Sequence, residues 1–358
     1  ADMGCQPHQG AGYFPVADEK IQNFYTEKYG VVHPTKAGLK IPQIFDAAIN
    51  KEVKAVWIIG EDVVQTDPNS AHDAKAMNAL DLLVVQEIFL SETAKHADVV
   101  LPGTTFLEKD GTFTNTERRV QRVNRAAKPL PGTKPDGVIV TEMMQKLGFD
   151  QKTYDADEVL AEIADIVPFF KGITRERLGK LGLQWPVKED GTDTKILHEK
   201  EFKLGKGRLK YFDWKESSEI NKNKKEYPLI LTTSRVLQHY NAATMTRRTN
   251  NINIVDEDIL LVHPQDAKYR ELNTGDIARL YSGRGEVALK VEVTDKVKEG
   301  VVFTTFHFPE HMVNMVTGHG KDEETKCAEY KVSSVEVQKI SNQFKTDHYK
   351  EDKRVEIK

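Results

Sequence analysis

Three short apolar runs in the first third of the chain lack the alternation of a half-buried strand. They lie at 53–59, 82–85 and 99–101. Strands of a parallel sheet are buried on both faces, so they give continuous apolar runs of this kind. Segments with helical periodicity separate and follow these runs, at about 41–50, 70–80, 92–96, 138–147 and 155–167. The pattern predicts an α/β fold with a doubly wound parallel sheet.

Small, polar or acidic residues follow each predicted strand, at 60–62, 86–87 and 102–105. Open α/β sheets bind ligands at the carboxyl ends of their strands. Carboxylate and amide groups there suit a nucleobase and a ribose, which offer N–H and O–H donors. The chain has no GxGxxG motif, so the fingerprint of NAD-type sites is absent. The alternative is that these segments are ordinary turns, with Asp62 as a helix cap.

Beyond residue 226 the chain changes to short strands separated by turns. The expected strands lie at 229–233, 259–262, 277–281, 286–293 and 300–308, and a short helix is expected at 264–272. Gly-Asp at 275–276 and Ser-Gly-Arg-Gly at 282–285 mark the turns. Short strands with such punctuation are typical of a compact β-barrel.

These patterns predict four parts of the chain. An α/β domain occupies 1–150, and a helical or irregular connection follows at 151–226. The barrel occupies 227–340, and a charged tail occupies 341–358. The connection ends in the polar and charged stretch 219–226, which we interpret as a linker or an exposed loop.

Composition excludes several classes of protein. The chain has 358 residues with 51 basic and 55 acidic side chains, so its formal net charge is −4. A nucleic-acid binder would carry a concentrated basic face, and this balance argues against one. No apolar run approaches the roughly 18–20 residues that a membrane-spanning helix needs. Hydrophobic residues make up 39%, which is enough for ordinary cores and excludes a disordered chain.

The two cysteines, Cys5 and Cys327, do not form a CxxC pair. The chain therefore cannot by itself supply a four-thiolate zinc or iron–sulfur site. We expect two buried free thiols, with a single disulfide as the alternative.

The segment 232–248 is the most informative in the chain, because it packs Arg, His, Tyr, Asn and Thr side chains into one loop after a strand. Guanidinium groups match phosphate oxygens bidentately, so this loop suits phosphates and a polar heterocycle. The alternative is a solvated basic loop without a ligand.

The pattern Arg-x-x-x-His-Tyr-Asn-x-x-Thr-Met-Thr-Arg-Arg at 235–248 resembles a loop of known enzymes. It is similar to the loop that opens the C-terminal domain of molybdopterin- or tungstopterin-dependent formate dehydrogenases, in the dimethyl-sulfoxide-reductase superfamily. Further segments resemble motifs of that family: ADMG at 1–4, GEDVVQTD at 60–67, VQEIFLSETA at 85–94, ADVVLP at 97–102, EKDGTFTN at 108–115, His-Pro-x-Asp-Ala at 263–267, Phe-His-Phe at 306–308 and Glu-Tyr-Lys at 329–331. Ser234 departs from the Gly that the family usually carries, and Gly103 from the Ser of some relatives.

The resemblance implies that the first domain and the barrel, which would be of the double-psi type, bind a bis(molybdopterin guanine dinucleotide) cofactor of Mo or W. One guanosine would be held at the strand ends by Asp62, Thr66, Gln86 and Asp136. The barrel-side face of the pterins would be lined by Arg235, His239, Tyr240, Thr244 and Thr246 and closed by Tyr330 and Lys331. His307 is open between a pterin contact and a satisfied core histidine.

The resemblance also implies that the chemistry lies partly elsewhere. The family's catalytic cysteine or selenocysteine, its neighbouring histidine and its [4Fe–4S] cysteines precede the point where this chain begins. We therefore assign no catalytic or metal-ligating residue here, and Cys5 is not at the metal-ligand position. We expect the C-terminal half of a catalytic subunit, with a large apolar surface on the α/β side left bare by the missing half.

The implied function is oxidation of formate to CO2, or the reverse. The expected partners are the N-terminal half of the same subunit and an iron–sulfur electron-transfer subunit. We expect a cytoplasmic location, with the periplasm as the alternative. Two other functions stay open: a nitrate-reductase-like enzyme, which His239-Tyr240-Asn241 disfavours because those relatives tend to carry Trp-His, and a non-catalytic module for cofactor binding or subunit docking.

Overall fold

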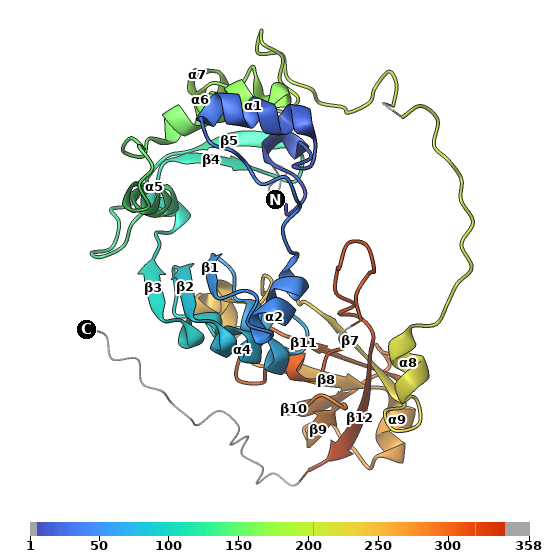
Figure 1. Cartoon of the computed structure of the whole chain (residues 1–358). Helices are drawn as coiled ribbons and strands as arrows, with labels where there is room; N and C mark the ends of the chain where they lie inside the picture. Colours follow the sequence, from blue (N-terminus) through green and yellow to red (C-terminus); the bar gives the residue numbers. More distant parts are fainter. Residues whose placement is uncertain (1–5, 203, 319, 341–358) are drawn as a thin grey trace. The chain divides into compact units, whose positions relative to one another are not determined.

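The computed structural model describes residues 6–202, 204–318 and 320–340. The chain forms two compact units, and each unit is assembled from two separate stretches of sequence. The first unit contains 1–41 and 101–211, and the second contains 42–100 and 212–358. Figure 1 labels their helices and strands.

The α/β part of the second unit is a three-stranded sheet in the order β1-β2-β3. Its strands are β1 (Ala55–Ile59), β2 (Leu82–Glu87) and β3 (Val99–Pro102). β1 and β2 run parallel, with Ala55 opposite Leu82, which confirms the parallel sheet expected from the continuous apolar runs. The helical segments between and before them are α2 (Ile41–Ile49), α3 (Val63–Thr66), α4 (Ser70–Ala79) and η2 (Thr93–His96).

One face of this sheet is covered within its unit. Phe45 of α2 and Met77 of α4 pack with Leu83 and Val85 of β2 in a buried cluster. Three large apolar side chains elsewhere on the strands, Ile59, Leu82 and Val99, are 42–47% exposed. Side chains alternate between the two faces of a strand, so Leu82 and Leu83 of β2 point to opposite sides. The side of the sheet that carries Leu82 therefore exposes apolar surface.

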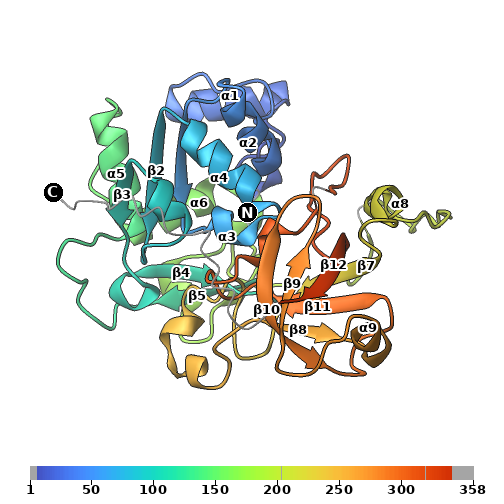
Figure 2. The same ribbon diagram turned by 90° about the horizontal axis from the view of Figure 1, so that it is seen from below.

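The rest of the second unit is a closed six-stranded barrel in the order β10-β8-β11-β7-β12-β9, which confirms the predicted barrel. Figure 2 shows its strands from below. The strands are β7 (Leu229–Ser234), β8 (Ile259–Val262), β9 (Ile277–Tyr281), β10 (Glu286–Val293), β11 (Val301–Thr305) and β12 (Ser333–Lys339). β7 pairs in parallel with β11, and β8 with β10, while the other pairs are antiparallel.

Alternating side chains fill the barrel, as the period of two predicts for strands with one buried face. Leu229 and Leu231 of β7, Leu280 of β9 and Leu289 of β10 are buried in one cluster. Two expectations need correction. The last apolar run leaves the barrel after Thr305 rather than at residue 308, and β12, which the sequence did not predict, closes the barrel between β7 and β9.

The first unit combines helices with a small antiparallel sheet, β4-β5-β6. Its elements are η1 (Ala11–Tyr13), α1 (Glu19–Tyr29), η3 (Phe106–Glu108), β4 (Gly111–Thr114), β5 (Arg119–Val123), α5 (Asp136–Lys146), α6 (Ala156–Ile166), η4 (Pro168–Phe170), α7 (Arg175–Leu178) and β6 (Leu183–Gln184). Asp155 caps α6 by accepting from the backbone N–H of Asp157 and Glu158. Val120, Leu160, Phe170 and Leu178 belong to its core.

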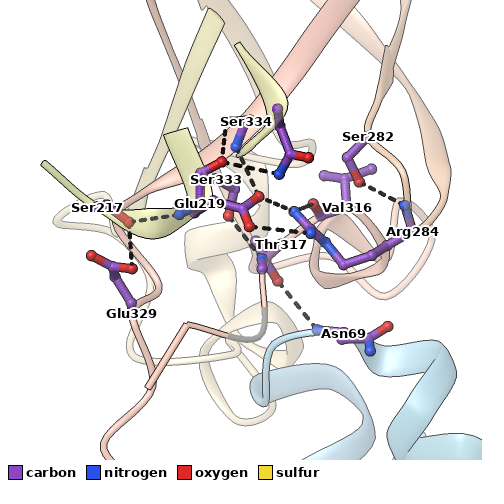
Figure 3. A network of polar contacts seen from close by, with 12 residues as sticks. Asn69, Ser217, Glu219, Ser282, Arg284, Val316, Thr317, Glu329, Ser333 and Ser334 are labelled. Carbon is purple, nitrogen blue, oxygen red and sulfur yellow. Dashed lines mark hydrogen bonds and ion pairs between the residues drawn. The ribbon is translucent and has the colours of Figure 1, made fainter. Parts of the chain in front are cut away.

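The stretch 219–226 was expected to be a linker or an exposed loop, and its first part is instead helical, while residues 222 and 224–226 are exposed. It overlaps helix α8 (Ser218–Asn223), and the side chain of Glu219 is only 11% exposed. Figure 3 shows Glu219 facing Arg284, with which it forms an ion pair. The Glu219 carboxylate also accepts the backbone N–H of Ser334 at the start of β12, 3.2 Å away. The polar composition of α8 therefore did not indicate its buried contact with the barrel.

Two further expectations can be checked in the described part of the chain. Cys327 is a free, exposed cysteine, so the prediction of a buried thiol is wrong for it, and Cys5 lies outside the described residues. The expected charged tail, 341–358, also lies outside them. Within the described ranges no helix is both long enough and apolar enough to cross a membrane.

Candidate functional site

Three segments that are far apart in the sequence meet in the second unit. They are the turn after β1, the loop 235–248 after β7, and the segment 306–317 after β11. The side-chain N–H2 of Gln65 donates to the carbonyl oxygens of Ala242 and His307, each 3.1 Å away. The side chain of Asn314 donates to the carbonyl of Gln65 at 2.8 Å. The strand-end turn and the predicted loop therefore lie side by side.

The predicted residues at the strand ends are held by bonds within the protein. The Asp62 carboxylate accepts from the N–H of Thr93 at 2.8 Å, from its hydroxyl at 2.7 Å and from the N–H of Glu92 at 3.2 Å. Asp62 therefore caps the first turn of η2 and makes no side-chain bond to α3. The Thr66 hydroxyl donates to the Asp62 carbonyl, and Gln86, buried on β2, lies opposite Ile59.

His239 and Thr246 brace the loop from inside. His239 is buried, and its Nδ1 and Nε2 lie 3.0 Å from the Thr246 hydroxyl and 2.8 Å from the Val255 carbonyl. The same hydroxyl accepts the backbone N–H of Tyr240 at 3.2 Å. A carbonyl oxygen only accepts, so Nε2 of His239 donates to Val255. Between these braces the side chain of Tyr240 is 75% exposed.

Two cations gather at the start of this loop. Arg235 donates to the side-chain oxygen of Asn241 at 3.0 Å, and its guanidinium lies 5.7 Å from the centre of the Phe306 ring. Lys331 donates to the carbonyl of Thr233, the residue before Ser234 at the end of β7. Burial, with a smaller contribution from the charge of Arg235, lowers the pKa of Lys331. Two cations that repel each other favour an anion between or beside them.

Tyr330 joins this cationic region to the strand-end turn. Its backbone carbonyl accepts the hydroxyl of Thr233 at 3.0 Å, and its own hydroxyl lies 3.5 Å from the carboxylate of Asp67. Asp67 and Asp73 line a cavity of about 70 Å³ in the same unit. Burial raises the pKa of Asp67 to about 7 and that of Asp73 to about 6. The turn therefore carries a carboxyl group that titrates near neutrality.

Asp136 is the one predicted site residue outside this unit. It is the first residue of α5 in the first unit, where its carboxylate pairs with Lys109. It lines a cavity of about 250 Å³ together with Tyr154 and Gly137. The structure thus brings the strand-end residues, the loop residues, Tyr330 and Lys331 into one unit and places Asp136 in the other.

Several residues of this region were missed or left open by the sequence analysis. His307 is buried, accepts the N–H of Val236 at Nε2 (3.1 Å) and contacts the Asn241 carbonyl through Nδ1 (2.7 Å), so it is a satisfied core histidine. Fully buried Asp258 accepts the backbone N–H groups of His307 and Phe308. The Phe-His-Phe motif pointed to His307, and Gln65 lies in the GEDVVQTD motif without having been singled out, while no motif contained Asp258 or Asn314.

The donor set fits part of the group that the family resemblance implies. Arg235 and Lys331 supply cationic donors for phosphate oxygens, and Gln86 and Thr66 can both donate and accept, as a guanosine requires. A metal ion has no such site, because the described residues contain no group of three or more His, Cys, Asp or Glu side chains placed to hold one. The residues therefore suit the organic part of the cofactor rather than its metal.

Comparison with known proteins gives two family matches. Residues 9–146 match the family described as "Molybdopterin oxidoreductase", and residues 229–334 match the "Molydopterin dinucleotide binding domain". The second match spans the loop 235–248 and reaches Tyr330 and Lys331.

Among curated proteins, the F420-dependent formate dehydrogenase subunit alpha of Methanocaldococcus jannaschii is 40% identical over 345 residues. F420-dependent formate dehydrogenase 2 subunit alpha of Methanococcus maripaludis is also 40% identical, over 347 residues. Each alignment covers 95% of this chain and 50% of the relative, so the chain spans about half the length of these curated relatives. The solved structure of acetylene hydratase from Pelobacter acetylenicus matches 89% of this chain and 50% of its own, with a TM-score of 0.64 and 20% identity, and shows the shared fold.

Proposed function

The chain belongs to the molybdopterin oxidoreductases, and we propose that it is the cofactor-binding half of a formate dehydrogenase alpha subunit. The cofactor is a bis(molybdopterin guanine dinucleotide) complex of Mo or W, and the reaction converts formate to CO2 or the reverse. When bound, this group supplies the two-electron chemistry, and the protein supplies binding and orientation.

The observation that carries the proposal is the meeting of Arg235 and Lys331 at the mouth of the loop 235–248. Arg235 follows the end of β7, and Lys331 lies just before β12. Both residues lie within the part of the chain that matches a dinucleotide-binding domain. Their charges are compensated by no carboxylate in the hydrogen bonds described above. Phosphate oxygens of the dinucleotide supply that compensation.

The remaining predicted residues take different roles in this proposal. Tyr240, Thr244, Tyr330 and Lys331 line the pterin side, and Thr66 and Gln86 bind a guanosine at the strand ends. His239 and Thr246 support the loop and do not themselves contact the cofactor, because their polar atoms form hydrogen bonds within the protein. A carboxylate accepts about four hydrogen bonds, so Asp62 keeps capacity beyond its three internal ones. Asp136 lies in the first unit, where it pairs with Lys109, and its contact with the guanosine stays a prediction of the resemblance.

The partners follow from the same proposal. We place the metal ligand and a [4Fe–4S] cluster in the part of the curated relatives outside the matched region, which we expect to be the N-terminal half, with an iron–sulfur subunit as the electron acceptor. The support is the length of the relatives, which is about twice that of the matched part.

The test is Arg235→Ala in the complete enzyme, with Mo, W and pterin measured per subunit. Loss of one charge-assisted phosphate contact should reduce cofactor content several-fold, while Arg208→Ala, which alters an exposed arginine outside the site, should leave it unchanged. Full metal and pterin content in Arg235→Ala would refute the assignment of this loop. Dye reduction with formate or with nitrate as the substrate then separates a formate dehydrogenase from a nitrate-reductase-like enzyme.

A further inference from the structure

The loop 235–248 contains a backbone turn that is sterically unfavourable. Asn241 and Ala243 both adopt left-handed conformations, with φ of 50° and 57°. L-residues other than glycine rarely occupy this region, because the Cβ atom approaches the backbone too closely. Such a conformation persists when the surrounding structure determines it. The contacts that hold this turn therefore decide whether the loop keeps its shape.

Two buried side chains hold the turn at consecutive carbonyl groups. Nδ1 of His307 lies 2.7 Å from the Asn241 carbonyl, and Nε2 of Gln65 donates to the Ala242 carbonyl at 3.1 Å. His307 belongs to the barrel side of the unit, whereas Gln65 belongs to α3, directly after β1. The same amide of Gln65 also donates to the His307 carbonyl at 3.1 Å. Gln65 thus bonds both to the turn and to its other support.

Gln65 also lies inside the strand-end turn that carries Asp62 and Thr66. Its own carbonyl accepts the side chain of Asn314 at 2.8 Å, so the backbone of α3 is fixed at this point. The side chain is 5% exposed, and water has little access to compete for its bonds. Gln65 therefore links the strand-end residues directly to the loop residues.

We propose that Gln65 is a positioning residue, which holds the turn 241–243 so that the loop and the strand end engage one dinucleotide together. The inference rests on the proposed function. It adds Gln65, a residue to which that function assigned no contact with the cofactor. The positioning role requires an amide side chain, because its N–H groups donate to carbonyl oxygens of two different segments. A carboxylate or an apolar side chain has no N–H group to donate.

The test compares Gln65→Met with Gln265→Ala in the complete enzyme. Met has a similar unbranched shape and no amide, so it removes the donor while it preserves packing. Gln265 is an exposed glutamine on α9 (Pro264–Tyr269) of the same unit and serves as the control. Two quantities are measured: hydrogen exchange of the amides of Ala243 and Arg247, which are bonded within the loop, and the rate of pterin release after dilution.

Gln65→Met should speed exchange at these two amides and release of pterin by roughly tenfold each, because buried carbonyls lose their donor. Amides of β9 and β10 should exchange as in the wild type, which a general loss of stability would not allow. Gln65→Glu, which places a carboxylate against the carbonyl oxygens, should give a larger effect in the same loop. If Gln65→Met does not fold, His307→Gln provides the second variant, with faster exchange expected in the same turn.

Unchanged loop exchange in Gln65→Met, or an equal rise throughout the barrel, would overturn the positioning role. Wild-type enzyme that contains neither pterin nor metal would instead overturn the proposed function. In that case loop exchange alone still decides whether Gln65 holds the turn, so the two failures can be told apart.

Discussion

Asp67 is a carboxyl group placed where its charged form is unfavourable. Burial is the main reason that its pKa lies near 7, and the negative charges of Asp73 and Glu61 add to it. Hydrogen bonds from Thr66 and Tyr330 oppose the shift but do not cancel it. Asp73 has its own raised pKa, of about 6, although His72, which bonds both Asp73 and Asp46, lowers it.

These two residues predict a fall in stability as the pH rises. Their folded pKa values exceed the ordinary value of 3.8, so the folded protein binds more protons than the unfolded chain between about pH 4 and 7. Below about pH 4 the contribution of these two groups to stability has its full value. This contribution declines as the pH rises through their folded pKa values, by at most about 1.4 kcal/mol per pH unit for each group.

Asp67→Asn should therefore flatten the pH dependence and raise the unfolding free energy at pH 8 more than at pH 5. Urea unfolding of the complete enzyme at both pH values measures this, with Asp295→Asn on the exposed barrel surface as the control. An equal change in stability at pH 5 and pH 8 would contradict the raised pKa of Asp67, because Asp67 would then make no pH-dependent contribution in this range.

At the scale of single residues, the sequence indicated which polar residues gather in motifs, but it did not indicate what their side chains contact. Asp62 and His239 stood in recognisable motifs, yet their polar atoms face the protein itself. Gln65 was invisible as a support because its partners are backbone carbonyls of Ala242 and His307, and any residue can present a carbonyl. A bond from a side chain to a distant backbone leaves no pattern in the sequence.

Among the elements, α8 shows how a charged segment can be buried. Glu219 and Arg284 are 11% and 16% exposed, and the same arginine extends toward the Val316 carbonyl (Figure 3). Removing one member of a buried pair leaves an uncompensated charge, which costs about 3–5 kcal/mol when the pair is fully dry. This pair retains some contact with water, so the cost should be somewhat below that range.

Arg284→Met should accordingly destabilise the second unit by about 2–3 kcal/mol, because Glu219 stays behind without its partner. Lys296→Met removes one member of the exposed pair with Glu292 and should cost less than about 1 kcal/mol. Thermal unfolding of the two variants compares them directly. Equal losses would mean that the Glu219–Arg284 contact contributes no more than a surface ion pair.

Strands with a strong hydrophobic pattern were predicted from the sequence, and strands with a weak pattern were missed. β1 and β2 were found because continuous apolar runs are characteristic of parallel strands. β5 (Arg119–Val123) was missed because its short, basic sequence has one buried position, Val120, and one of its two partners, β6, lies far along the chain. β12 was missed because Ser333 and Ser334 are buried polar residues at its start. Tertiary context, rather than local pattern, decides such strands.

For the whole molecule, the uncovered side of the sheet predicts a contact in the complete enzyme. Ile59, Leu82 and Val99 expose apolar side chains that the helices of their own unit do not cover. We expect the half of the relatives that lies outside the matched region to cover them. Hydroxyl-radical labelling of Leu82 should then be several-fold lower in the complete enzyme than in this chain alone.

Leu83, which is buried on the opposite side, provides the reference for that comparison and should label weakly in both samples. Equal labelling of Leu82 in the two samples would mean that this side of the sheet faces solvent in the enzyme as well.

The bond between Gln65 and the Ala242 carbonyl spans 177 positions of the sequence. A ribosome adds roughly 5–20 residues per second, so the strand-end turn emerges about 9–35 seconds before its partner does. During that interval the turn has no loop to support, and the sheet beneath it stands with unfinished contacts. The nascent chain is therefore most exposed to misassociation while residues 66–242, about half of its length, are being made, and slower translation there would lengthen this period rather than help the site to form.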